Sequence, residues 1–254
     1  MAHKPLVNST VREIGKGKAM IGGTVREVSH GNALVNGTVY KAGFSTPIGS
    51  LPVGTSVYFT INNTRTRCII VHQGRPSSMY DTSCDGTWVL MHNAFISAAF
   101  HGENSNSYIQ SVPYLFLRDT MPQAIEPNVR NAIKTAKIPY VHGNGNGYVL
   151  SGANGLASPC FILSAYEVGF TQANNGHLPI DGAVLDYFKA GASRVTYLNG
   201  GVVNWWFRSP AMGFANMMFI GNTSGGLDVL YCNYAAAIRF AFILSPDFDA
   251  TNYL

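Results

Sequence analysis

Residues 204–210, Asn-Trp-Trp-Phe-Arg-Ser-Pro, constrain the fold of this chain more than any other segment. Consecutive side chains of a strand point to opposite faces, so Trp205 and Phe207 share one face and Trp206 takes the other. A strand with large aromatic side chains on both faces must lie between two layers. Arg208 then needs a partner, because an unpaired buried guanidinium is costly. The partners that we expect are loop carbonyls or a carboxylate such as Asp181 or Asp228.

Two interpretations of this aromatic segment follow from its composition. Exposed indoles could form a platform on which sugar rings stack. The interpretation that we favour is a structural box, in which Trp205, Trp206 and Arg208 belong to a core strand that holds irregular loops in place.

Charged residues are scarce, and this narrows the class of protein. Lys and Arg number 17 and Asp and Glu 13, which makes 12% of the chain, about half of the usual share of about 25%. The chain also contains 27 Gly and 12 Pro. This composition excludes a helical bundle, a coiled coil and a charged disordered region, and favours a loop-rich β or α+β protein.

The distribution of charge and of apolar residues excludes further classes. The net charge of +4 is spread over the chain, so we expect no nucleic-acid binding. The longest apolar stretches, such as residues 235–244, are too short to span a bilayer, and we expect no membrane insertion. The N-terminus lacks the apolar core of a signal peptide, so we expect synthesis and folding in a reducing cytoplasm. We therefore predict reduced core thiols for Cys68, Cys84, Cys160 and Cys232.

A short internal repeat opens the chain. Residues 17–28 align with residues 31–42, and each copy predicts a strand, a two-residue turn and a strand. The turns Gly22-Gly23 and Asn36-Gly37 supply the positive φ that tight hairpins need. Two such hairpins cannot bury a core alone, so residues 1–48 are interpreted as an attachment module. A linker at residues 45–50 would connect it to a main domain of residues 49–254.

Short strands and two helices are predicted in the main domain. Residues 108–117 form the first predicted helix and residues 127–137 the second, since Val129, Ala132 and Ile133 share one face. The Gly- and Asn-rich residues 142–155 are interpreted as a loop. Strands are predicted at residues 56–61, 67–72, 88–91, 161–163, 203–207, 216–220, 227–231 and 238–244.

No motif in the sequence predicts catalysis. The histidines are dispersed, and H-E-x-x-H and G-x-S-x-G patterns are absent. Four acidic residues could instead bind calcium, because calcium takes carboxylate oxygens as ligands. The alternative is that their carboxylates cap backbone amides of turns. The candidate calcium ligands are Asp81, Asp85, Glu167 and Asp181.

Four ordered segments point to a known family. They are Val71–Met91, Leu163–Thr171, Tyr197–Pro210 and Ile238–Phe248. They resemble a family of proteins encoded by phages and prophages of gut Firmicutes, marked by a W-W-L-R-S-P box and a closing G-V-R-P-A-F-x-L strand. The resemblance extends from about Ser50 to Asp249, and repeats similar to Gly17–Ala42 precede such domains in phage structural proteins. The chain departs from the pattern by apolar exchanges at Phe207, Ala237, Ile238 and Phe240.

That family resembles, more distantly, the C-type-lectin-like fold of phage tropism determinants and formylglycine-generating enzymes. The resemblance implies an α+β domain of loop-rich antiparallel strands with two helices. It also implies that residues 211–237 present side chains to a receptor. Tyr and Asn suit this role, since they offer contact area and adaptable hydrogen bonds. The implied ligand-binding residues are Phe214, Asn216, Met218, Asn222, Asp228, Tyr231, Asn233 and Tyr234.

The resemblance implies a bacteriophage virion protein that binds rather than catalyses. Residues 1–48 would attach to other virion proteins, and residues 49–254 would bind a host-surface glycan or protein, as tail-fibre or receptor-binding proteins do. No enzymatic activity and no cofactor are expected. A homo-oligomer, with a trimer as one option, would turn weak contacts into avidity. The alternatives are a capsid or tail decoration (head fibre) protein with a structural role, and a lectin-fold oxidase or wall hydrolase.

Overall fold

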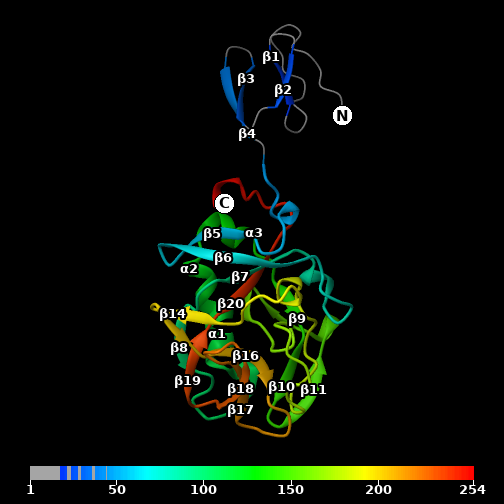
Figure 1. Cartoon of the computed structure of the whole chain (residues 1–254), viewed down its shortest axis with the longest axis vertical. Helices are drawn as coiled ribbons and strands as arrows, with labels where there is room; N and C mark the ends of the chain where they lie inside the picture. The colour runs from blue at the N-terminus through cyan, green and yellow to red at the C-terminus, as the bar shows by residue number, and fades with distance from the viewer. Residues whose placement is uncertain (1–17, 22–23, 28–29, 36–37, 44) are drawn as a thin grey trace. The chain divides into compact units, whose positions relative to one another are not determined.

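The computed structural model describes residues 18–21, 24–27, 30–35, 38–43 and 45–254 (Figure 1). The chain divides into two compact units. The first comprises residues 1–46 with 249–252, and the second comprises residues 47–248 with 253–254.

The first unit contains two antiparallel hairpins. The hairpin prediction for the repeat is confirmed, because in both copies the paired strands flank the two residues expected to turn. The turn residues themselves, Gly22-Gly23 and Asn36-Gly37, lie outside the described residues. The strands are β1 (Lys18–Ile21), β2 (Thr24–Glu27), β3 (His30–Val35) and β4 (Thr38–Gly43).

A five-stranded antiparallel sheet forms one layer of the second unit, in the order β13-β20-β7-β6-β5. Every residue of β7 and β20 is buried, as expected for strands that are covered on both faces. The last strand in sequence, β20, therefore lies inside the sheet, between β13 and β7. The strands are β5 (Ser56–Ile61), β6 (Thr64–Gln73), β7 (Thr87–Met91), β13 (Cys160–Ile162) and β20 (Phe240–Leu244).

A second five-stranded sheet has the order β18-β17-β16-β19-β8. Its central strand, β16, contains the aromatic segment, and runs antiparallel to β17 and parallel to β19. The strands are β8 (Ile96–Ala99), β16 (Trp205–Pro210), β17 (Met217–Gly221), β18 (Leu227–Tyr231) and β19 (Ala235–Ile238).

The aromatic side chains of β16 are fully buried and lie on both faces, as predicted. The rings of Trp205 and Phe207 lie 4.5 Å apart between centroids, whereas Trp206 packs against Phe100 at 5.3 Å. Both indole N–H groups donate to backbone carbonyls at 2.9 Å, which is how buried indoles are usually accommodated. The interpretation of this segment as a core strand is confirmed, and its use as an exposed sugar platform is excluded.

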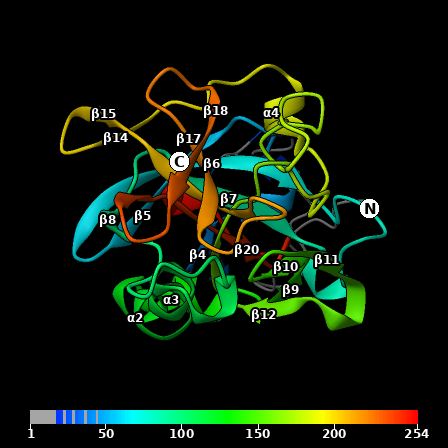
Figure 2. The ribbon, with the colours of Figure 1, turned by 90° about the horizontal axis from the view of Figure 1, so that it is seen from below.

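The helical region differs from the prediction. A run of short helical segments replaces the first helix, and the second ends at Ala132 instead of Lys137. It ends there because Ile133 bridges to Leu244 and the next residues enter strand β9. Figure 2 shows α2 and α3 together on one side of the sheets. The segments are η3 (Tyr108–Gln110), α1 (Val112–Leu115), the π-helix η4 (Phe116–Thr120), α2 (Met121–Ala124), α3 (Pro127–Ala132) and, later in the chain, α4 (Asp186–Lys189).

Residues 142–155 are not a loop but contain most of a hairpin. Its turn residues, Asn144 and Gly145, have φ of 57° and 78°, the positive values that a tight type I′ turn requires. The remaining pairs of strands are also short. They are β9 (Ala136–Ile138) with β12 (Leu156–Ser158), β10 (Tyr140–Gly143) with β11 (Asn146–Leu150), and β14 (Thr196–Leu198) with β15 (Gly201–Val203).

Single 3₁₀ turns complete the described part of the chain. The latter half of the predicted linker is one of them, and Ile48 within it is fully buried in the second unit. The turns are η1 (Ile48–Ser50), η2 (Thr82–Cys84), η5 (Gly152–Asn154) and η6 (Thr251–Tyr253).

The architecture is α+β with mainly β structure, as predicted. All four cysteines are free and buried, in agreement with the prediction of core thiols. Among the described residues, no helix is both long and apolar enough to cross a membrane.

Candidate functional site

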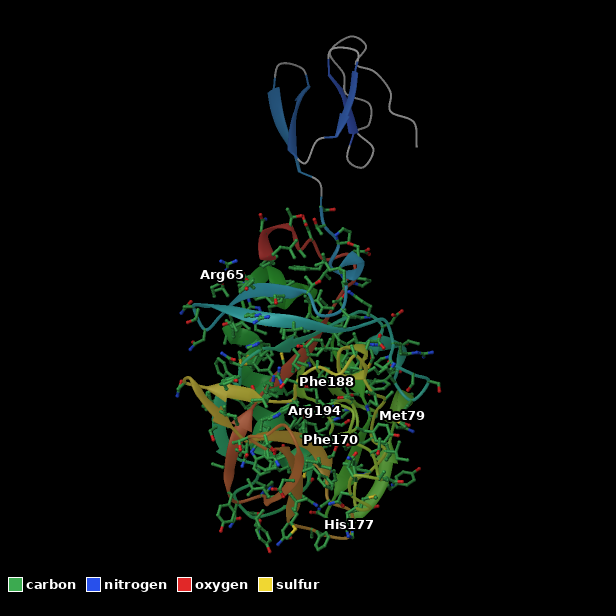
Figure 3. The ribbon with its side chains drawn as sticks, in the orientation of Figure 1. Arg65, Met79, Phe170, His177, Phe188 and Arg194 are labelled. Atoms are coloured by element: carbon green, nitrogen blue, oxygen red, sulfur yellow. The ribbon has the colours of Figure 1, made fainter. Side chains whose placement is uncertain are left out.

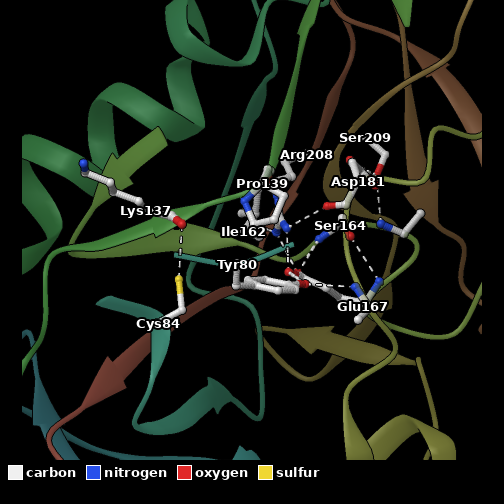
Figure 4. A network of polar contacts seen from close by, with 12 residues as sticks. Tyr80, Cys84, Lys137, Pro139, Ile162, Ser164, Glu167, Asp181, Arg208 and Ser209 are labelled. Carbon is white, nitrogen blue, oxygen red and sulfur yellow. Dashed lines mark hydrogen bonds and ion pairs between the residues drawn. The ribbon is translucent and has the colours of Figure 1, made fainter. Parts of the chain in front are cut away.

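A buried ionic cluster lies at the end of strand β16 (Figure 4). Arg208 and Glu167 are both fully buried, and Arg208 Nη1 and Nη2 donate to the two carboxylate oxygens at 2.6 and 2.5 Å. Three further N–H groups of the guanidinium donate to the backbone carbonyls of Pro139, Ile162 and Asp181. The expected loop carbonyls are confirmed, but the carboxylate partner is Glu167. Asp181 contributes its carbonyl, and Asp228 is exposed.

Two further groups donate hydrogen bonds to the Glu167 carboxylate. The Tyr80 hydroxyl donates to Oε1 at 2.7 Å, and the Ser164 N–H donates to Oε2 at 2.9 Å. Burial and the Glu167 charge together raise the pKa of Tyr80 well above its usual range. Burial alone would lower the pKa of Arg208, but the Glu167 carboxylate more than offsets it, so that the pKa is raised. The cluster therefore contains a charged, bidentate ion pair.

A second buried carboxylate lies beside the ion pair. The Ser209 hydroxyl lies 2.8 Å from the Asp181 carboxylate and accepts from the Ala165 N–H at 2.9 Å. Burial raises the pKa of Asp181 to about 6, and the positive charge of Arg208 limits the rise. Glu167 and Asp181 flank the segment 168–180. Because both are held by neighbouring residues of β16, the cluster fixes the two ends of this long loop.

The cluster is a structural support, since its charged groups have no access to solvent. The four carboxylates considered for calcium do not form a site: within the described residues, no three His, Cys, Asp or Glu side chains gather as metal ligands. Asp81 instead accepts from the Ser83 N–H at the start of a 3₁₀ turn, the capping role that was the other expectation.

Five segments of loops and strand ends meet at the end of the second unit where β17, β18, β10 and β11 lie (lower end in Figure 1). We call this surface the tip. Asn106 is fully buried and joins three of its segments. Its Nδ2 donates to the carbonyls of Phe214 and Met217 at 2.6 and 3.1 Å, and its Oδ1 accepts from the Asn144 N–H at 2.6 Å. The segments of the tip are residues 101–106, 143–148, 172–178, 212–216 and 231–234.

The loop held by the ionic cluster forms one side of the tip, where Figure 3 labels His177. The backbones of His177 and Met212 are joined by a 2.9 Å hydrogen bond, and the His177 ring lies 5.2 Å from the ring of Phe214. A β-carbon placed on Gly147 would lie 2.6 Å from the Met212 sulfur, so the β10–β11 hairpin contacts the segment 212–216 as well. The ionic cluster thus supports the tip through the loop 168–180.

Residues 231–234 form another part of the tip. The Cys232 N–H donates to Asn216 at 3.0 Å, and its carbonyl accepts from the His101 N–H at 2.9 Å. The side chains of Tyr231 and Tyr234, on either side of this backbone, are exposed to solvent. Their ring centroids lie 6.3 Å apart. Four aromatic side chains of the tip are exposed: Tyr148 by 69%, Tyr234 by 59%, Tyr231 by 44% and Phe214 by 40%.

The structure brings together five of the eight residues that the resemblance implies for binding. These are Phe214, Asn216, Tyr231, Asn233 and Tyr234, all at the tip. Asn222 and Asp228 lie toward the other end of the β17–β18 hairpin, where the Asn222 side chain accepts from Ser224 and Gly226 N–H groups and so stabilises the turn. The prediction that Met218 is exposed is wrong, because its side chain is fully buried.

Several members of the tip were not predicted from the sequence, among them Tyr148, His177 and the buried Asn106. Tyr148 lies in the segment interpreted as a loop. The Asn-Gly pair at 144–145, a turn signal between strands, could have indicated that the hairpin presents it.

Comparison with known proteins identifies the family of the chain. Residues 85–246, more than half of the chain, match the family described as a domain of unknown function, DUF6273. The chain belongs to this family. No curated protein and no solved structure matches the chain.

Proposed function

We propose that this chain is a bacteriophage virion protein whose tip binds a glycan or protein on the host surface. One observation supports the proposal most: four exposed aromatic side chains belong to segments that meet at one end of the second unit, and buried polar groups hold these segments in place. Rigid aromatic side chains on a supported scaffold are typical of recognition surfaces, because they lose little conformational entropy on binding. The proposal includes a C-type-lectin-like fold for the second unit and binding rather than catalysis.

The sequence resemblance supports the viral part of this proposal. It assigns residues 1–48 to attachment on the virion and residues 49–254 to display, in a homo-oligomer that adds weak contacts into avidity. The two hairpins of residues 18–43 are compatible with this role, since such small sheets need other surfaces for stability.

Binding of the full-length chain to cells of the strain that the source phage infects tests the proposal. Replacing both Tyr231 and Tyr234 by Ala is expected to weaken binding about 10-fold or more, because central aromatic residues contribute most of the energy of an interface. The matched control is Tyr197→Ala, which removes a similarly exposed Tyr from the β14–β15 hairpin, away from the tip. Equal binding of both variants, or no binding by the unmodified chain, would contradict the proposal.

Immunogold labelling of intact particles tests the location. A few copies at the tail end would agree with receptor binding, and many copies on the head would favour the decoration role. Absence of the protein from purified particles would rule out both virion roles.

A further inference from the structure

The tip carries almost no charge. Across its five segments, Glu103 is the only Asp, Glu, Lys or Arg. Residues 138–185 add no charge to the surface, because their charged residues are Glu167 and Asp181, which are both fully buried. Exposed Lys and Arg lie elsewhere, such as Arg65 and Arg67 on β6 and Lys189 in α4. An anionic ligand at the tip therefore meets no Lys or Arg that would compensate its charge.

Amide side chains take the place of charges. The five segments contain nine Asn or Gln residues. The oxygens of Asn146 and Asn174 accept hydrogen bonds within their own loops, from Tyr148 and Thr171. Their Nδ2 groups make no hydrogen bond in the described part of the chain, so both present free donors to solvent. Five amide side chains of the tip are exposed: Asn144, Asn146, Gln172, Asn174 and Asn233.

The tip segments carry exposed aromatic rings together with these amides. Tyr231 and Tyr234 are inclined to each other by 39° and enclose Asn233 in sequence. A sugar ring offers an apolar C–H face to an aromatic side chain and a rim of hydroxyls to amides. A protein interface, in contrast, has an apolar core and is enriched in Arg, and the tip segments contain no Arg.

We infer that the ligand of the tip is an uncharged polysaccharide, recognised by aromatic stacking and by the free amide donors. This inference rests on the proposed function and names its ligand class. It excludes phosphate- or carboxylate-bearing wall polymers, since an anion at the tip would lose solvation without gaining a cationic partner.

Cell walls purified from the host strain are the probe, with the full-length chain measured in a sedimentation assay. Binding is expected to survive protease treatment of the walls and to be lost after periodate oxidation, which cleaves vicinal diols. It is also expected to change less than about twofold between low and high salt, because screening acts on charged pairs. Replacing Asn233 and Asn174 by Ala is expected to weaken binding at least about fivefold, while Asn63→Ala, an exposed Asn of the β5–β6 turn, has no effect.

The outcomes separate this inference from the proposed function. Binding to cells that is lost after protease treatment would indicate a protein receptor, and binding that falls about 10-fold with salt would indicate an anionic polymer. Either result overturns the inference and leaves the receptor-binding role in place. If the chain binds neither cells nor walls, both are wrong.

Discussion

Glu167→Gln tests whether the buried ion pair supports the second unit. Gln has the shape of Glu, but it carries no charge and turns an N–H₂ group toward the donors of Arg208. The two short bonds between Glu167 and the guanidinium are then lost or weakened. Tyr80 and Ser164 also lose a charged acceptor. Arg208 remains fully buried with no counter-charge.

The expected loss of stability is large. Removing one partner of a buried pair costs about 3–5 kcal/mol, out of the roughly 5–15 kcal/mol that stabilise a typical domain. In a domain of this size, about 1 kcal/mol shifts the midpoint of thermal unfolding by roughly 2–4 °C. We therefore expect the unfolding midpoint of the Glu167→Gln variant to fall by roughly 6–20 °C at pH 7.

Differential scanning calorimetry of the full-length chain measures this shift, and urea unfolding at low temperature measures it independently. Glu103→Gln is the matched control, because Glu103 is exposed, and changes at exposed sites usually alter stability by less than about 0.5 kcal/mol. A shift below about 2 °C for Glu167→Gln would refute the reasoning.

Three further predictions follow from other buried groups. Because burial raises the pKa of Asp181 to about 6, its contribution to stability is complete below the unfolded pKa of about 3.9 and is lost as the pH rises through 6. Between pH 7 and pH 5 the free energy of unfolding of the unmodified chain should thus rise by about 1.4 kcal/mol more than that of Asp181→Asn, as measured by urea unfolding. An equal pH dependence of the two proteins would show that Asp181 titrates normally. Asn106→Asp removes the amide N–H₂ group that donates to two backbone carbonyls. The variant should be destabilised by about 1–3 kcal/mol, and proteolysis within the tip should be faster. An unchanged rate of cleavage would contradict the role of Asn106 in joining three segments of the tip. Finally, burial raises the thiol pKa values, to about 12 for Cys84 and Cys232; Ellman's reagent should find no reactive thiol in the native chain and four after denaturation, and fast native labelling would contradict the buried positions.

Local patterns predict much of the fold. The alternation of apolar residues and the Gly- and Asn-containing turns place β5, β18 and the β17–β18 hairpin close to their observed positions. The failures have tertiary causes. Residues 133–137 have a helical pattern, but pairing of Ile133 with Leu244 and of β9 with β12 supplies hydrogen bonds that a longer helix would have lost.

The candidate site is predictable in residue type but not in arrangement. The need of Arg208 for a partner follows from burial alone, yet Glu167 lies 41 positions away, and no local pattern distinguishes it from Asp181. Tyr231 and Tyr234 were expected at the surface and lie there. The sequence did not show that Met218, unlike these two residues, is buried. Which face of β17 is buried depends on its register with β16 and β18.

The position of β20 determines when the second unit can fold during synthesis. This strand is synthesised after the other four strands of its sheet, yet it lies between β7 and β13. Until the ribosome has released residues 240–244, β7 and β13 have unpaired edges and an uncovered apolar face, the condition under which chains aggregate. The core of this sheet can therefore close only after residues 240–244 have emerged from the ribosome. A chain that terminates a few residues before Phe240 would lack an inner strand of this sheet and leave β7 and β13 unpaired along one edge each.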